Sequence, residues 1–83
     1  MAKTTTTNAR PLYEIAREIK NDWKKVYFGA KPYLDAMATL NSINDNYGFD
    51  SGKLIVLYFL GNAATWRGET AKRIKAELKA MAK

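Results

Sequence analysis

The longest apolar run in this 83-residue chain is Leu54-Ile55-Val56-Leu57-Tyr58-Phe59-Leu60, and it decides how the rest must fold. The run is too short to span a membrane, which takes about 20 residues in a helix. Its β-branched and aromatic residues would suit a buried strand, but no second strand candidate exists to pair with it. We therefore predict a helix over residues 52–60 that is apolar around its whole circumference, so that neighbouring elements must cover every side of it.

Two amphipathic segments precede this run. Behind Pro11, apolar residues recur at three- and four-residue spacing and predict a helix that ends near Gly29. A second helix is predicted to start around Pro32. The residues expected to face inward are Leu12, Ile15, Ala16, Ile19, Trp23, Val26 and Tyr27 in the first helix, and Tyr33, Ala36, Met37, Leu40, Ile43 and Tyr47 in the second.

The segment between the second and third helices carries helix-end signals. Gly48 suits the left-handed position just after a helix, where Phe49 would fold back on Ile43. Asp50 or Ser51 is expected to cap the third helix.

The end of the apolar run carries a stop signal. Gly61 and Asn62 predict the end of the third helix, although one helix continuing through Gly61 is the main alternative. Thr65 is expected to cap a last helix that runs from Trp66 to the C-terminus. Its inward residues would be Thr70, Ala71, Ile74, Leu78 and Met81, and Arg73 would pair with Glu69 and Glu77, four residues to either side.

These elements predict an all-α fold, a compact four-helix single domain with the apolar helix at its centre. The domain is expected to cover residues 10–83. Residues 1–9, which are polar and aperiodic, are expected to form a flexible N-terminal tail.

The charge balance favours anionic partners. Fourteen Lys and Arg residues against eight Asp and Glu residues give a net charge of +6. In the first helix one edge carries Tyr13, Arg17, Lys20 and Lys24, while the other carries Glu14, Glu18 and Asp22. The last helix carries a stripe of Lys72, Lys75, Lys79 and Lys83. If the first and last helices pack side by side, their basic edges would merge into one partner-binding surface formed by Tyr13, Arg17, Lys20, Lys24, Lys72, Lys75 and Lys79.

The composition leaves little catalytic chemistry. The chain has no cysteine and no histidine, which removes a thiolate nucleophile, an imidazole base and metal sites built from those residues. It has no glycine-rich phosphate loop either. We therefore expect a protein that is not an enzyme and that takes no cofactor and no metal.

Two short motifs fail on inspection. A calcium loop with Gly48 at its sixth position would place Ile43 at the first ligand position, where an oxygen ligand is required. Ala64 and Gly68 have the spacing of a helix-turn-helix, but Arg67 and Glu69 stand where apolar side chains should flank the glycine.

The aromatic residues are expected to be mostly internal. Trp23, Tyr33, Tyr58 and Phe59 fall on apolar faces, where core packing explains them. Outside, we expect Tyr13 among its basic neighbours and Trp66 beside Arg67.

The N-terminus predicts an intracellular, cytoplasmic protein without membrane insertion. It has no apolar signal segment, and Ala2 stands where myristoylation requires glycine. Binding of the last helix to a membrane surface is a further option, but its apolar face is needed inside so small a fold.

The chain resembles small helical accessory proteins encoded by bacteriophages and prophages. The likeness rests on the stretch YFLGNAATWRGETAKRIKAEL at residues 58–78, together with LYEIA at residues 12–16 and the pair Asp22-Trp23. The resemblance implies a setting in the host-cell cytoplasm and binding to a host or phage macromolecule, including inhibition of a defence or replication factor. It implies no particular site residue.

Together these features predict a small non-enzymatic binding protein that docks on a macromolecular target through the basic surface. An acidic protein surface is the preferred partner. Direct binding of nucleic acid through the same Lys and Arg residues is the alternative.

Overall fold

All four predicted helices are present, together with a short hairpin that the sequence did not predict. A computed structural model describes residues 10–82. The helices are α1 (Leu12–Asp22), α2 (Lys31–Met37), α3 (Gly52–Gly61) and α4 (Glu69–Met81), and the antiparallel strands are β1 (Asn46–Tyr47) and β2 (Asp50–Ser51). The fold is therefore mostly helical but not purely all-α.

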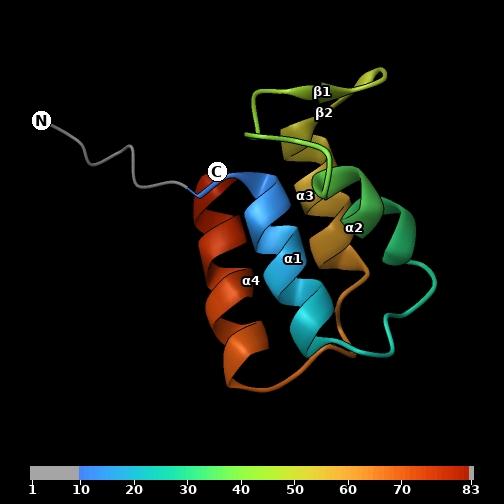
Figure 1. Ribbon diagram of the computed structural model, residues 1–83, viewed down its shortest axis with the longest axis vertical. Coiled ribbons are helices and arrows are strands. Elements are labelled where there is room, and N and C mark those ends of the chain that lie inside the picture. The colour runs from blue at the N-terminus through green and yellow to red at the C-terminus, as the bar shows by residue number, and fades with distance from the viewer. Residues whose placement is uncertain (1–9, 83) are drawn as a thin grey trace, which may run out of the picture.

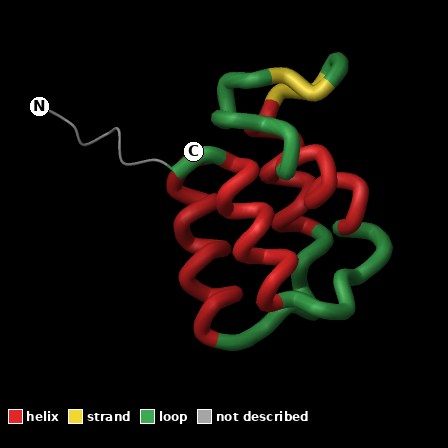
Figure 2. Tube along the Cα trace, in the orientation of Figure 1, coloured by secondary structure: helices red, strands yellow, loops and turns green. Residues whose placement is uncertain are grey.

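The helices close around one core. α1 lies beside α4 and runs in the opposite direction (Figure 1), and it also contacts α2. α3 in turn contacts both α2 and α4. Figure 2 shows that the loops joining α1 to α2 and α3 to α4 run along the same end of the molecule, while the hairpin projects from the other end.

The core follows the predicted helical spacing. α1 buries Leu12, Ile15, Ala16 and Ile19, and α4 buries Ala71, Ile74 and Leu78. Full burial of one large aliphatic side chain contributes about 1.5–3 kcal/mol. Burial of these two faces therefore supplies much of the free energy that holds α1 against α4.

Three aromatic rings fill the core near the loop end of the molecule. Trp23 and Trp66 stack with centroids 5.7 Å apart and planes 11° apart. Phe59 of α3 meets both indoles edge-on, at 6.2 Å and 6.3 Å. The prediction that Trp66 lies outside is wrong, because the indole is buried and its Nε1–H donates to Asp22 Oδ2 at 2.8 Å.

The first helix is shorter than predicted. α1 ends at Asp22 rather than near Gly29, and the backbone at Trp23 turns away from helical geometry. The turn places the Trp23 ring against the other two aromatic rings. Tyr27, expected inside, is exposed in the loop that follows.

The second helix is also shorter than predicted. α2 ends at Met37, and Leu34, which the spacing left off the inward face, is buried. Beyond it the chain turns, and the carboxylate of Asp45 accepts the backbone N–H groups of Asn41 and Ser42.

Gly48 belongs to the hairpin and not to a helix end. It has the predicted positive φ, 65°, but it lies in the turn between β1 and β2. Phe49 is fully exposed beside it and does not fold back on Ile43. Tyr47, predicted to face inward, is also exposed.

The apolar run forms α3 as predicted. Ser51 caps it, with its Oγ accepting the N–H of Leu54 at 3.2 Å, and the helix ends at Gly61. The prediction that neighbours cover it on every side is wrong: Leu54, Leu57 and Tyr58 remain 40–45% exposed. Its contacts come from α2, α4 and the hairpin, which leave its outer face to solvent.

The last helix begins later than predicted. α4 starts at Glu69 with Gly68 as its N-cap, and no side chain caps it, so Thr65 does not have the predicted role. Trp66 lies in the preceding loop rather than in the helix.

The predicted N-terminal tail, residues 1–9, and Lys83 lie outside the described residues. Among residues 10–82, each helix is too short or too polar to cross a membrane.

Candidate binding surfaces

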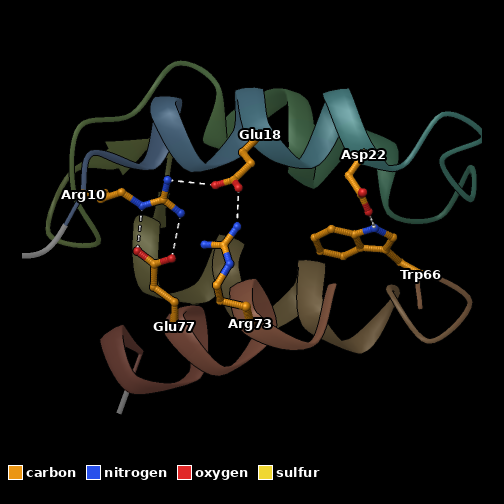
Figure 3. A network of polar contacts seen from close by, with 6 residues as sticks. All are labelled: Arg10, Glu18, Asp22, Trp66, Arg73 and Glu77. Carbon is orange, nitrogen blue, oxygen red and sulfur yellow. Dashed lines mark hydrogen bonds and ion pairs between the residues drawn. The ribbon is translucent and has the colours of Figure 1, made fainter. Parts of the chain in front are cut away.

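A network of charged groups ties α1 to α4. Arg10 donates two hydrogen bonds to the carboxylate of Glu77, from Nη2 at 2.7 Å and from Nε at 2.9 Å, and a third from Nη1 to Glu18 at 2.9 Å. Glu18 also pairs with Arg73 (Figure 3). Arg73 therefore bonds across to α1 rather than to Glu69 and Glu77 within its own helix.

These contacts shift the pKa values of the groups involved. The hydrogen bonds from Arg10 and then Arg73 lower the pKa of Glu18 below its usual range. The bonds to Glu77, and more weakly to Glu18, raise the pKa of the Arg10 guanidinium. These hydrogen bonds thus favour the charged forms of Arg10 and Glu18.

The acidic edge of α1 therefore faces α4. Glu18 and Asp22 point toward α4 and its preceding loop (Figure 3). The basic edge lies on the other flank, where Lys20 Nζ is 3.2 Å from Asp35 Oδ1 of α2. The side-by-side packing of α1 and α4 thus does not join the two basic edges.

The predicted site residues form two separate groups. On α1 and just beyond it, Arg17 and Lys24 are exposed, as is Tyr13, while Lys20 pairs with Asp35. On α4, the lysines occupy the flank opposite to Arg73 and Glu77 by helical spacing. This second group consists of Lys72 and Lys79, both exposed, and Lys75, which is half-buried.

Lys75 lies at a hollow beside Trp66. It has a volume of about 280 Å³ and is lined by Trp66, Arg67, Gly68, Ala71, Lys72 and Lys75. The Lys75 ammonium donates to the backbone oxygen of Trp66 at 2.6 Å and lies 5.9 Å from the centroid of the indole ring. Burial, with repulsion from Lys79 and Arg67, lowers the pKa of Lys75.

Exposed apolar side chains line one face of α3. Leu54, Leu57 and Tyr58, together with Gly61, recur at the spacing of one helical face, and we call the first three the outer α3 surface. Tyr58 also packs on Tyr33 of α2, with ring centroids 5.3 Å apart.

Exposed aromatic residues stand at both ends of this helix. At its N-terminal end the hairpin carries Tyr47 and Phe49, and β2 leads directly into α3. At its C-terminal end the loop after α1 carries Tyr27 and Phe28, whose ring centroids are 4.8 Å apart. Seven of the eight large hydrophobic side chains that residues 10–82 leave exposed thus belong to α3 or to these two ends.

A separate hollow adjoins the C-terminal end of α3. It has a volume of about 380 Å³ and is lined by Tyr27, Gly61, Asn62, Ala64 and Thr65. Asn62 is fixed there, because its side-chain amide donates to the Tyr58 carbonyl at 2.9 Å.

This apolar surface was not predicted, although the sequence carries a signal for it. A helix that is apolar all round needs neighbours on all sides. Residues 10–82 form three other helices, one of them seven residues long, and these leave one face of α3 uncovered.

Comparison with known proteins adds no assignment. No protein-family model, curated protein or solved structure matches this chain. In the part of the chain that the structure describes, no cluster of three or more acidic side chains is arranged to hold a metal ion.

Proposed function

We propose that this chain is a non-enzymatic binding protein that docks on a protein partner through the outer α3 surface. One observation carries the proposal: nearly all the large hydrophobic side chains that residues 10–82 leave exposed gather on α3 and at its two ends. On soluble proteins a contiguous apolar area of this kind marks an interaction site more often than single exposed residues do.

The composition of the surface suits protein recognition. Tyrosine and other aromatic residues are enriched in the centres of protein interfaces, where they bury much apolar area at a small cost in conformational entropy. Tyr58 is held by its contact with Tyr33, and the two leucines stand on a regular helix. The contact groups are therefore positioned before a partner arrives, which lowers the entropic cost of binding.

The preferred partner has acidic residues around an apolar contact area. The chain has a net charge of +6, and Lys53 is exposed beside Leu54 in the first turn of α3. Charges around an interface mainly accelerate association and orient the partner, while the buried side chains supply most of the affinity. The basic edge of α1 would act in the same way. Because the chain resembles bacteriophage accessory proteins, we propose a host or phage protein as the target.

The test compares two surface variants in a pull-down after nuclease treatment. The first variant is Leu57→Ser with Tyr58→Ser, and the matched control is Tyr13→Ser, which alters an exposed tyrosine on α1. All these side chains are partly exposed, so circular dichroism and thermal melting should show both variants folded. The bait is the tagged full chain, the lysate comes from the native host, and the captured protein is then purified for titration.

We expect the parent protein and Tyr13→Ser to bind the purified partner equally well. The double variant should bind at least about thirtyfold more weakly, because one central interface side chain contributes about 2 kcal/mol. Loss of every partner on nuclease treatment would contradict the proposal. Equal binding by all three proteins would contradict the assignment to α3.

A further inference from the structure

The cationic hollow beside Trp66, on the flank of α4 opposite to α1, is a second site with a different chemistry. Arg67, Lys72 and Lys75 all line it, and its other lining residues carry no charged side chain. Lys79 is near enough for its charge to add to burial in lowering the pKa of Lys75. The nearest acidic residue along the chain, Glu69, starts α4 but does not line the hollow.

In the described part of the chain, the three cations that line this hollow and the nearby Lys79 have no acidic partner. Within residues 10–82, Arg67, Lys72, Lys75 and Lys79 take part in no ion pair, whereas Arg10, Lys20 and Arg73 each do. Like charges gathered in this way repel one another, and an anion bound among them would relieve that repulsion.

Lys75 is held in place for such a role. Its ammonium donates to the Trp66 carbonyl and lies near the indole ring, which leaves two of its three N–H groups for another acceptor. Its position is therefore fixed before any ligand binds. Arg67 and Lys72 have exposed side chains at the rim that can close on the same ligand.

We propose that this hollow binds a phosphate group. A phosphate monoester carries nearly two negative charges at neutral pH and several acceptor oxygens, which suits three cations better than a single carboxylate does. The guanidinium of Arg67 offers a two-pronged donor to two phosphate oxygens, and the lysines act as point charges. The phosphate can be free in solution or can belong to a nucleic-acid backbone, and the two sources are distinguished by experiment.

This proposal is independent of the outer α3 surface. The two share no residue, so either can fail without affecting the other.

The test uses two double variants with the same loss of charge. Arg67→Gln with Lys72→Gln alters the hollow, whereas Lys25→Gln with Lys31→Gln removes two exposed charges elsewhere. Lys75 is left intact because it also bonds to the backbone. Each protein is titrated with inorganic phosphate, and separately with a single-stranded oligothymidine, at constant pH and ionic strength. Binding is followed by NMR through the amide signals of residues 66–75 and the indole N–H of Trp66.

We expect saturable shifts of these signals in the parent protein and in Lys25→Gln/Lys31→Gln. The affinity of Arg67→Gln/Lys72→Gln should be at least about tenfold lower, because two charge-assisted contacts are lost. This pattern with inorganic phosphate assigns the site to a free phosphate group, and the same pattern with the oligonucleotide alone assigns it to a backbone phosphate. Absence of saturable shifts with both ligands, or equal weakening in both double variants, would overturn the proposal.

Discussion

Glu18 makes the stability of this protein sensitive to acid. Hydrogen bonds from Arg10 and Arg73 hold its pKa below the ordinary value of 4.5. The unfolded chain therefore takes up a proton at a higher pH than the folded chain does. The stability that Glu18 contributes is complete above pH 4.5 and is lost as the pH falls through its lower folded-state pKa.

Replacing Glu18 by Gln should remove this part of the acid sensitivity. Glu18→Gln should be less stable than the parent protein at neutral pH, and the difference should shrink as the pH falls below about 4. Urea unfolding at pH values between about 6 and about 3 measures both effects. Glu14→Gln is the matched control, because it removes a carboxylate from the same helix without breaking a described ion pair. A constant difference between Glu18→Gln and the parent at every pH would contradict this account.

Trp66 shows which residue positions the sequence could not predict. Helical spacing identified the buried residues of α1 because they repeat along one element. Trp66 lies in a loop and stacks on Trp23, which comes from a different segment. No local pattern records a contact between two loops, so the indole looked exposed. The hollow that Lys75 lines depends on this loop and was equally hidden.

At the scale of a single element, the glycines at the two ends of α3 should differ in how much stability the protein loses when each is replaced by alanine. A Cβ atom on Gly52 would lie 2.7 Å from the backbone oxygen of Ser42 and 2.9 Å from the Cα of Ile43. A Cβ atom on Gly61 would have no neighbouring atom within 4 Å. The first glycine allows the base of the hairpin to approach the helix closely, while the second stands at the open end of the helix.

Gly52→Ala should destabilise the protein by about 1–3 kcal/mol, because the backbone of residues 42 and 43 must move. Gly61→Ala should leave the stability unchanged or raise it by up to about 1 kcal/mol, because alanine is the better helix former. Chemical unfolding of the two variants beside the parent protein measures the contrast. Equal destabilisation by both substitutions would show that the close approach at Gly52 is not the cause.

The elements were predictable where the signal is local. The start of α3 follows from the Ser51 cap, and its end from Gly61 and Asn62. The hairpin was missed because a glycine with positive φ fits a helix end as well as a hairpin turn, so Gly48 supported the wrong element. The end of α1 was missed because the apolar spacing continues beyond Asp22 after the helix has stopped.

At the scale of the whole molecule, the sequence could not predict which flank of one helix meets which neighbour. Helical spacing identifies the buried face of α1. It does not tell which of the two edges beside that face lies toward α4 and which lies toward α2. The pairing of Glu18 with Arg73 shows that the acidic edge faces α4, and the pairing of Lys20 with Asp35 shows that the basic edge faces α2. The predicted site residues therefore lie in two separate groups, and the ion pairs that accompany this arrangement join residues that no single-helix pattern contains.

The ion pair between Arg10 and Glu77 should hold the two ends of the described fold together. Arg10 precedes α1, Glu77 lies in the second half of α4, and 67 positions separate them in the chain. Their side chains are only 29% and 27% exposed, and two hydrogen bonds join them. Partly buried two-pronged pairs of this kind couple more strongly than exposed single contacts.

A double-mutant cycle with Arg10→Met and Glu77→Gln should therefore give a coupling free energy of about 1 kcal/mol or more. The matched control is the cycle with Lys20→Met and Asp35→Asn, because that pair joins α1 to α2 but is 46% and 50% exposed. Its coupling should stay below about 0.5 kcal/mol. Urea unfolding of the seven proteins, the parent being common to both cycles, supplies the values, and raising the salt concentration should reduce the control coupling more than the first. If the two cycles gave equal couplings, the Arg10 to Glu77 contact would be an ordinary surface pair, and the burial of the hydrophobic faces of α1 and α4 would alone account for their association.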